Sequence, residues 1–286
     1  MSLNSQTNFS LGLHLHKAGH KSYTAALLAL IKEFPMLTDV QMFVCGPQNT
    51  RCNVIDPEFV ATARAKKIDI NVHGSYMALP WKSTALFNHS LQNLRAAHAI
   101  GAANVIFHIP YKPLEEWFPS VEALAAQAEE EKLGPMIVLE TAATIRHPTM
   151  SYESPEKLNI LADAISAADL RGRVGICVDT AHIFASKVDI RTYEAAQKYC
   201  KKLPAGAIAE IQLNGNSIVP GDKTTRDEHE IPLSDADLIW RGLSYRESGC
   251  RAFIEYGAAL NIPIVIEWKS RHGPAQVHEF LRKMRA

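Results

Sequence analysis

The sequence predicts an α/β protein, a (β/α)8 TIM barrel that forms a single domain over residues 1–286. Eight short apolar or β-branched runs recur along the chain, and each is followed by a segment with the periodicity of a helix. The length suits one barrel of this kind, and no linker or internal repeat divides the chain. The alternative is a doubly wound open sheet, but no Gly-x-Gly-x-x-Gly motif follows the first predicted strand.

The predicted strands are short and apolar, and several end in a polar side chain. The run VGICVD, for example, is apolar up to Asp179, which is the pattern of a strand buried on both faces of a parallel sheet. In chain order, the predicted strands are residues 11–16, 40–45, 68–73, 104–108, 136–140, 174–179, 208–213 and 262–267.

Helical periodicity fills the segments between the strands and continues after the last one. The predicted helices lie within residues 22–34, 56–67, 83–101, 120–132, 154–170, 189–203, 235–260 and 273–285. Short polar side chains, two of them followed by proline, are candidate N-caps: Asp56, Ser83, Ser120, Ser154, and Ser234 or Asp235.

Composition and charge narrow the class of protein. Apolar residues make up 47% of the chain, which is ample for a packed core. The 30 basic and 30 acidic side chains cancel, so a nucleic-acid partner would have to be bound by a local basic patch. The N-terminal residues lack the pattern of a signal peptide, and no apolar run is long enough to span a bilayer. We therefore expect no membrane partner.

The five cysteines indicate a reducing compartment. Their odd number and the absence of a C-x-x-C spacing argue against a disulfide framework and against a thiolate zinc site. We expect an intracellular protein of the cytoplasm or nucleus. Whether Cys45 and Cys52 form a pair stays open at this stage.

Metal-ligand side chains stand where the predicted strands end. In a (β/α)8 barrel the catalytic groups lie at the carboxyl ends of the strands, and imidazole and carboxylate ligands without thiolates suit zinc, manganese or iron. Because the candidates exceed the ligands that one ion accepts, we expect two or three ions that share a bridging carboxylate, with Glu140 as the bridge. Such clusters serve phosphoester cleavage above all. The candidates are His73, His108, Glu140, Asp179, His182, Asp227, His229 and Glu267.

The other histidines are predicted to be structural. His14 is expected near the site and His16 to point away from it. The structural set is His89, His98, His147, His272 and His278.

Several segments resemble the endonuclease IV family of apurinic/apyrimidinic (AP) endonucleases, and the resemblance spans nearly the whole chain. The more specific segments are VHGSYMALP (72–80) and GICVDTAHIFAS (175–186). The segments GPQNTR and PWK (80–82) are most similar to copies carried by large DNA viruses. The remaining matches are VIFHIP (105–110), IVLETAAT (137–144), IQLNGNS (211–217), RDEHEIP (226–232) and IVIE (264–267).

The resemblance implies a metal-dependent enzyme of base-excision repair. It would hydrolyse the phosphodiester 5′ to an abasic site in double-stranded DNA and leave a 3′-hydroxyl and a 5′-deoxyribose phosphate. Glu140, Asp179 and Glu267 would be its catalytic carboxylates. It would act as a monomer, and a viral copy would be a candidate for association with the virion.

The resemblance also implies three zinc ions, with Mn²⁺ as an alternative metal. His73 and His108 would bind one ion, and Glu140 would bridge it to a second. Asp179, Glu267 and, by its position, Gln212 would complete the second ion. The third ion would be held by His182, Asp227 and His229.

Two positions depart from the family pattern. Gln212 stands where the family has a histidine, and an amide oxygen is a poorer zinc ligand than an imidazole. Three outcomes stay open: a weakened third ion with activity retained, a two-metal enzyme, or a protein that binds DNA but cleaves it poorly. Glu228 replaces an arginine, although Lys223 and Arg226 lie just upstream.

The resemblance assigns damage recognition to side chains of the loops after the second and third strands, which would fill the gap left by an extruded abasic nucleotide. Lys112, Lys187, Lys269 and Arg271 also follow strand ends and could contact phosphates. The DNA-binding candidates are Asn49, Arg51, Tyr76, Met77, Lys82 and Arg226.

A different class of enzyme remains as the rival. Metal-dependent sugar isomerases and epimerases use the same barrel and also place Glu, Asp and His at successive strand ends. A site with one sugar-binding metal would not need the additional set His73, His108, His182, Asp227 and His229.

Overall fold

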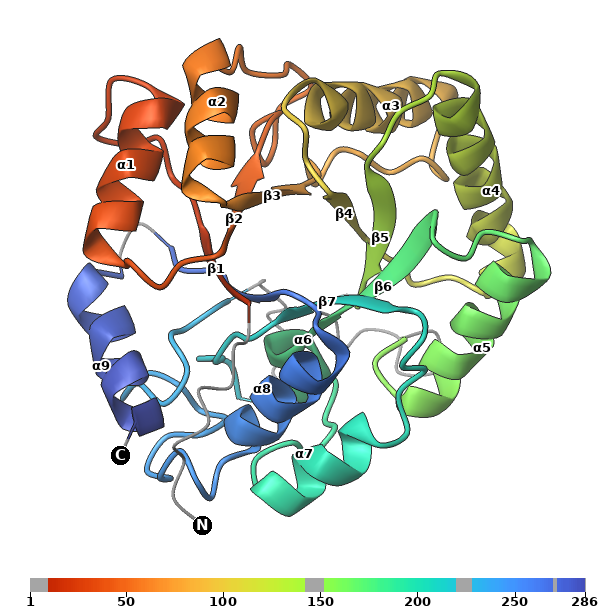
Figure 1. The fold of residues 1–286 in the computed structure, drawn as a ribbon. Coiled ribbons are helices and arrows are strands. Elements are labelled where there is room, and N and C mark those ends of the chain that lie inside the picture. The colour runs from red at the N-terminus through yellow and green to blue at the C-terminus, as the bar shows by residue number, and fades with distance from the viewer. Residues whose placement is uncertain (1–9, 142–151, 220–227, 270–271, 286) are drawn as a thin grey trace.

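The computed structural model describes residues 10–141, 152–219, 228–269 and 272–285. Eight parallel strands follow one another around a closed barrel, and the last strand pairs with the first (Figure 1). The predicted fold class is therefore confirmed. The strands are β1 (Leu11–His14), β2 (Asp39–Phe43), β3 (Asp69–His73), β4 (Asn104–His108), β5 (Met136–Glu140), β6 (Val174–Asp179), β7 (Ile208–Gln212) and β8 (Ile264–Ile266).

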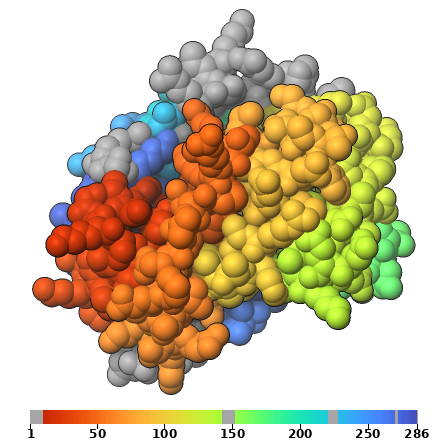
Figure 2. Space-filling model, turned by 90° about the horizontal axis from the view of Figure 1, so that it is seen from above, coloured from red at the N-terminus to blue at the C-terminus, as the bar shows by residue number. Residues whose placement is uncertain are grey.

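Helices surround the barrel as an outer ring. Along one side, the segments from α1 to α4 form a continuous wall (Figure 2). The helices of the described residues are α1 (Tyr23–Glu33), α2 (Pro57–Lys66), α3 (Thr84–Ala99), α4 (Leu114–Glu130), α5 (Pro155–Ala167), α6 (Thr180–Ala185), α7 (Tyr193–Cys200), α8 (Gly249–Leu260) and α9 (Pro274–Arg285). None of them is long and apolar enough to cross a membrane.

Two predicted helix starts are wrong. Helix α4 begins at Leu114 rather than after Ser120, because its first turns bury Trp117 and Phe118 and this packing outweighs the cost of Pro119 inside the helix. Ser83 and Ser154, by contrast, cap α3 and α5 as predicted.

The other wrong start concerns the segment 235–248, which is not helical although the sequence predicts a helix over 235–260. The carboxylate of Asp237 accepts hydrogen bonds from the backbone N–H groups of Leu233 and Ile239, which holds this part of the chain in turns. Helix α8 therefore begins only at Gly249, with Ser248 at its N-cap.

Glycine at position 215 is required by close packing. A Cβ atom there would lie 2.6 Å from the Cγ atom of Asp237. The side chain of Asp237 thus orders the chain beyond β7 and excludes a larger residue at Gly215.

One disulfide lies in the loop after β2. It joins Cys45 to Cys52, a pairing that the sequence leaves open. Cys177, Cys200 and Cys250 are free and buried. Cys177 packs in the barrel interior with Ile106 and Val138.

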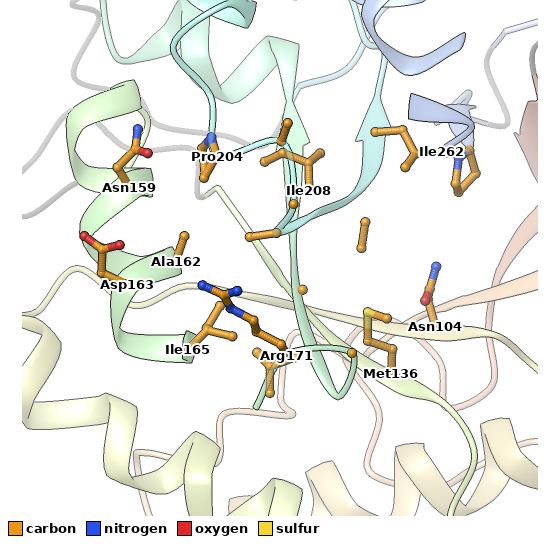
Figure 3. Close-up of a pocket in the computed structure, with 18 of the residues that line it drawn as sticks. Asn104, Met136, Asn159, Ala162, Asp163, Ile165, Arg171, Pro204, Ile208 and Ile262 are labelled. Carbon is orange, nitrogen blue, oxygen red and sulfur yellow. The ribbon is translucent and has the colours of Figure 1, made fainter. Parts of the chain in front are cut away.

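A hollow of about 530 Å³ lies at the amino-terminal ends of the strands, opposite to the predicted site. Figure 3 shows Asn159 and Asp163 of α5 on one side of it and Asn104 and Met136, which begin β4 and β5, on the other. Among the described residues that line it, only Asp163 and Arg171 are charged. These residues therefore form no cluster of metal-ligand side chains.

Candidate metal centre

The barrel brings the predicted strand-end ligands together. His73, His108, Glu140 and Asp179 are the last residues of β3, β4, β5 and β6. Strand pairing places His108 directly beside Glu140. Because neighbouring parallel strands end at the same rim, side chains that lie far apart in the sequence converge on one volume.

The first group that could hold a metal consists of His73, His108 and Glu140. The Oε2 atom of Glu140 lies 3.3 Å from Nε2 of His73 and 3.2 Å from Nε2 of His108. The two imidazole nitrogens are 3.3 Å apart. Glu140 is fully buried and His73 nearly so. Two imidazoles and a carboxylate that converge in this way are a typical zinc ligand set.

The second group consists of Asp179, His182 and His229. Asp179 caps the short helix α6, and its Oδ1 atom accepts a hydrogen bond from the backbone N–H of His182 at 2.9 Å. Nε2 of His229 lies 3.3 Å from Nε2 of His182 and 3.5 Å from Oδ2 of Asp179. This cap explains the three-residue spacing of Asp179 and His182 in DTAH, because it directs the two side chains toward the same candidate metal position.

Glu140 connects the two groups. While its Oε2 atom faces the first group, its Oε1 atom lies 3.2 Å from Nδ1 of His182. The two carboxylate oxygens of Glu140 thus face one group each, and its role as a bridging ligand stays a prediction.

Backbone carbonyls orient two of the imidazoles. Nδ1 of His73 lies 2.7 Å from the carbonyl of Gly74, and Nδ1 of His182 lies 2.5 Å from the carbonyl of Thr141. A carbonyl only accepts hydrogen bonds, so in each neutral ring the proton is on Nδ1 and the lone pair of Nε2 faces the centre of the site. This is the usual arrangement of histidines that bind a metal.

The pKa shifts describe a buried and strongly coupled set of charges. Burial acts to lower the pKa of His73, but the hydrogen bond and charge of Glu140 raise it to about 9. Burial acts to raise the pKa of Glu140, but the charge and hydrogen bonds of the surrounding histidines hold it well below its usual range. Burial raises the pKa of Asp179. The site thus holds anionic oxygens in a place where water cannot solvate them, which favours a bound cation.

Glu267 and Gln212 complete the interior of the site. Glu267 follows β8, and its Oε2 atom lies 3.0 Å from Nδ1 of His229. Gln212 ends β7 and is fully buried. Asp227, the remaining predicted ligand, lies outside the described residues, as do Arg226, Lys223, Arg271 and His147.

Two amides of the site were not singled out in the sequence. Gln41 lies in β2 and donates from Nε2 to Oε1 of Glu267. Asn214 donates from Nδ2 to Oδ2 of Asp179 at 2.6 Å. The available signal for Gln41 was a polar residue inside the apolar run VQMFVC.

The remaining described histidines behave largely as predicted. His14 is buried with Nδ1 4.0 Å from Oε1 of Glu267, and burial and the charge of His16 lower its pKa to about 3. Nε2 of His16 lies 2.6 Å from the carbonyl of Trp268. His272 pairs with Glu230 at 3.0 Å, and His278 with Glu33 at 2.7 Å.

Two loops beside the first group carry exposed side chains. Tyr76 and Met77 are 38% and 39% exposed. The ring of Tyr76 stands edge-on to those of His73 and His108, with centroids 5.4 and 5.2 Å away. The other described DNA-binding candidates, Asn49, Arg51 and Lys82, are exposed.

These loops are bound to one another. Oγ of Ser75 donates to the carbonyls of Pro47 and Asn49, both at 3.1 Å. The backbone N–H of Tyr76 donates to the carbonyl of Pro47 at 2.8 Å. The disulfide-closed loop and the loop that carries Tyr76 therefore form one surface at the rim of the site.

Comparison with known proteins agrees with this arrangement. No protein-family model matches the sequence. The sequence is 27% identical over 240 residues to "Probable AP endonuclease" of African swine fever virus (isolate Tick/Malawi/Lil 20-1/1983), and the match covers 79% of this chain and 77% of the relative.

Three solved structures show the same fold. The crystal structure of AsfvAP:AG matches with a TM-score of 0.81 and 20% identity, over 96% of this chain and 99% of that one. Endonuclease IV from Thermus thermophilus matches with a TM-score of 0.73 and 20% identity, over 96% of this chain and 97% of that one. A xylose isomerase domain containing protein from Salmonella typhimurium matches with a TM-score of 0.69 and 14% identity, over 97% of this chain and 96% of that one.

The fold alone therefore does not separate the nuclease from the isomerase. This chain is a (β/α)8 protein that is similar over most of its length to viral proteins named probable AP endonuclease.

Proposed function

We propose that this protein is a metal-dependent AP endonuclease. Its substrate is double-stranded DNA with an abasic site, and it incises the phosphodiester 5′ to that site to leave a 3′-hydroxyl and a 5′-deoxyribose phosphate. The observation that carries the proposal is the pair of ligand groups that face each other across Glu140. Two adjacent ions are the arrangement that cleaves phosphoesters.

The metal is proposed to be zinc, with Mn²⁺ as the alternative, because imidazole and carboxylate donors suit both. His73, His108 and Glu140 would hold one ion, and Asp179, His182 and His229, with Asp227, another. When bound, the ions supply a Lewis acid for the phosphate and lower the pKa of water. A third ion would need the position where Glu140, Asp179 and Glu267 meet Gln212.

The protein's own residues orient and shield this chemistry. The carbonyls of Gly74 and Thr141 fix the rings of His73 and His182. Burial of Glu140 and Asp179 excludes bulk water and strengthens their charge interactions with the ligands around them.

The exposed loops would recognise the damage. Tyr76 and Met77 lie beside the first ligand group, where they could fill the space of an extruded abasic nucleotide. Asn49, Arg51, Lys82 and Arg226 would contact the DNA. Lys269 contributes less than the sequence suggests, because it pairs with Glu228 at 3.1 Å. We propose that the protein acts as a monomer inside the cell.

The sugar isomerase is the weaker candidate. A single sugar-binding metal would leave one of the two histidine-containing groups without a role, and a buried imidazole and carboxylate set without a cation is costly. A protein that binds abasic DNA without cleaving it remains the alternative that Gln212 raises.

The test is cleavage of an end-labelled duplex with one tetrahydrofuran abasic analogue. This analogue cannot undergo β-elimination, so a chelator-sensitive cut that leaves a 3′-hydroxyl establishes metal-dependent hydrolysis. Preferential binding without cleavage would support the binding protein. Neither cleavage nor preferential binding of the abasic duplex would overturn the repair function.

A further inference from the structure

Gln212 lies where the three carboxylates of the family's second metal position meet. Its side chain is fully buried at the end of β7. The amide can face either of two ways. When its nitrogen faces Glu140 and Asp179, it donates to Oε1 of Glu140 at 3.0 Å and to Oδ2 of Asp179 at 3.2 Å. On its other side lie Oε1 of Glu267 at 3.3 Å and Oε1 of Gln41 at 3.4 Å.

Hydrogen bonding decides which way this amide faces. If its oxygen faced Glu140 and Asp179, it would lie beside two carboxylate oxygens, of which only Oδ2 of Asp179 has an amide donor in Asn214. The nitrogen would then make the two longer contacts to Glu267 and Gln41. The orientation with the nitrogen toward Glu140 and Asp179 gives two shorter bonds, both to carboxylates, whereas the other orientation gives one longer bond to a carboxylate and one to an amide. In the favoured orientation the oxygen of Gln212 lies beside Oε1 of Glu267, which has a donor of its own in Gln41. In that orientation Gln212 presents no ligand atom to a cation between Glu140 and Asp179.

Two further amides engage the same carboxylates. Gln41 donates to Oε1 of Glu267. Asn214 donates to Oδ2 of Asp179 at 2.6 Å and to Oε2 of Glu267 at 3.4 Å. Each of the three carboxylates therefore accepts at least one N–H from a buried neutral amide. Those N–H groups compete with a second-position cation for the carboxylate oxygens.

Glu267 has a different partner in this arrangement. Its Oε2 atom lies 3.0 Å from Nδ1 of His229, whose Nε2 atom faces His182 and Asp179. A carboxylate that accepts the Nδ1 proton of a ligand histidine fixes the ring and raises its basicity. Glu267 is thus placed to orient His229 rather than to bind an ion itself.

We propose that this chain carries two metal ions, one in each ligand group, and that the amide of Gln212 stands in place of the third ion. Glu267 then acts as a positioning residue for His229. The inference rests on the proposed function only for the expectation of a third ion, and its test does not require DNA.

The test is metal content by mass spectrometry after the full chain is loaded with excess zinc and desalted. We expect two ions per chain for the wild type and three for Gln212→His, in which an imidazole replaces the amide. Gln276→His is the matched control, because it adds the same side chain at an exposed position of α9 and should leave two ions. All metals are counted, so a third ion of another element would be seen.

Three ions in the wild type would overturn the inference. Two ions in both the wild type and Gln212→His would show that Gln212 does not close the position and would overturn its assignment. For Glu267→Gln, we expect both ions to remain, with the affinity of one of them about 10- to 100-fold weaker and the other unchanged, as is typical when an outer partner of a ligand is altered. Loss of a whole ion at saturating zinc would make Glu267 a ligand.

The count and the cleavage assay fail separately. Two ions without incision of abasic DNA would sink the proposed function and leave this inference standing. Incision of abasic DNA by a wild-type chain that holds three ions would support the proposed function and overturn this inference.

Discussion

The Nε2 atoms of His182 and His229 face each other at 3.3 Å although 47 positions separate the two residues in the sequence. Two imidazole nitrogens at this distance suit a shared ion better than a shared proton, since Nδ1 of His182 already lies against a carbonyl and Nδ1 of His229 against a carboxylate. We expect His182→Ala to remove one ion and to slow incision by more than about 100-fold. Metal content and single-turnover cleavage measure both effects. His278→Ala, at the surface, should change neither, and an unaltered ion count in His182→Ala would contradict the second ligand group.

Removal of the metals should destabilise the folded protein. Glu140, Asp179 and Glu267 are buried together, and among the described residues their carboxylates face histidines and neutral amides. Each ion present at about 1,000 times its Kd adds about 4 kcal/mol to the free energy of unfolding. We expect chelation to lower the Tm markedly and zinc to restore it. Calorimetry with and without chelator would measure this, and an unchanged Tm would argue against bound metal.

The disulfide should support DNA binding rather than metal binding. Cys45–Cys52 closes the loop that contains Pro47 and Asn49, and these residues accept hydrogen bonds from the loop of Tyr76. We expect the double variant Cys45→Ser/Cys52→Ser to bind the abasic duplex about 10-fold more weakly, because the loop must be ordered on binding. Its metal content should stay as in the wild type.

Fluorescence anisotropy with the abasic and the undamaged duplex measures this effect. A reductant should weaken binding by the wild type and leave the double variant unaffected. Equal binding by both proteins in oxidising buffer would refute the role of the disulfide.

Tyr76 should contribute through its ring. The ring packs against Phe43, His73 and His108 and remains partly exposed at the rim. We expect Tyr76→Ala to weaken abasic-duplex binding by about 10-fold, in line with the loss of one stacking contact of about 1–3 kcal/mol, and Tyr76→Phe to retain most of it. Binding is measured by titrating the wild type and both variants with DNA in the presence of chelator, so that loss of binding is separated from loss of catalysis. If the two variants bound equally weakly, the hydroxyl rather than the ring would be responsible.

Asp237 should make stability depend on pH. Burial raises its pKa from 3.8 to about 6, although backbone N–H groups oppose the shift. The folded state therefore holds the proton more tightly than the unfolded state, so the contribution of Asp237 to stability is greatest below about pH 4 and falls as the pH rises through about 6. The shift corresponds to about 3 kcal/mol.

Asp237→Asn isolates this contribution because the amide does not titrate. The variant loses the bond from Leu233, so we expect it to be less stable than the wild type at about pH 4. The difference between the two proteins in the free energy of unfolding should narrow by up to about 3 kcal/mol between about pH 4 and pH 7. Urea unfolding at a series of pH values measures it, and a difference that widened with pH would contradict the assignment.

The sequence predicts the site as far as strand ends define it. His73, His108, Glu140 and Asp179 each close a strand, and the parallel barrel has only one rim at which they can meet. Gln41 and Asn214 could not be assigned in this way, because their role depends on side-chain orientation around Glu267 and Asp179.

The two wrong predictions of helix starts also depend on contacts that the local sequence pattern does not contain. A helical pattern over 235–260 was outweighed by the carboxylate of Asp237, which accepts hydrogen bonds from the nearby N–H groups of Leu233 and Ile239 and from the distant N–H of Asn216. The start of α4 was decided by burial of Trp117, which local sequence signals do not contain. Burial of Trp117 and the bond from Asn216 to Asp237 are tertiary effects that override local propensity.

The position of Gln212 also has an evolutionary consequence. Either glutamine codon becomes a histidine codon by a single base change at its third position. If Gln212 stands in place of the third ion, as proposed, one point mutation at the end of β7 would add or remove an ion while the fold is inherited intact. On this proposal, the number of ions would be a poor marker of common descent among homologous barrels.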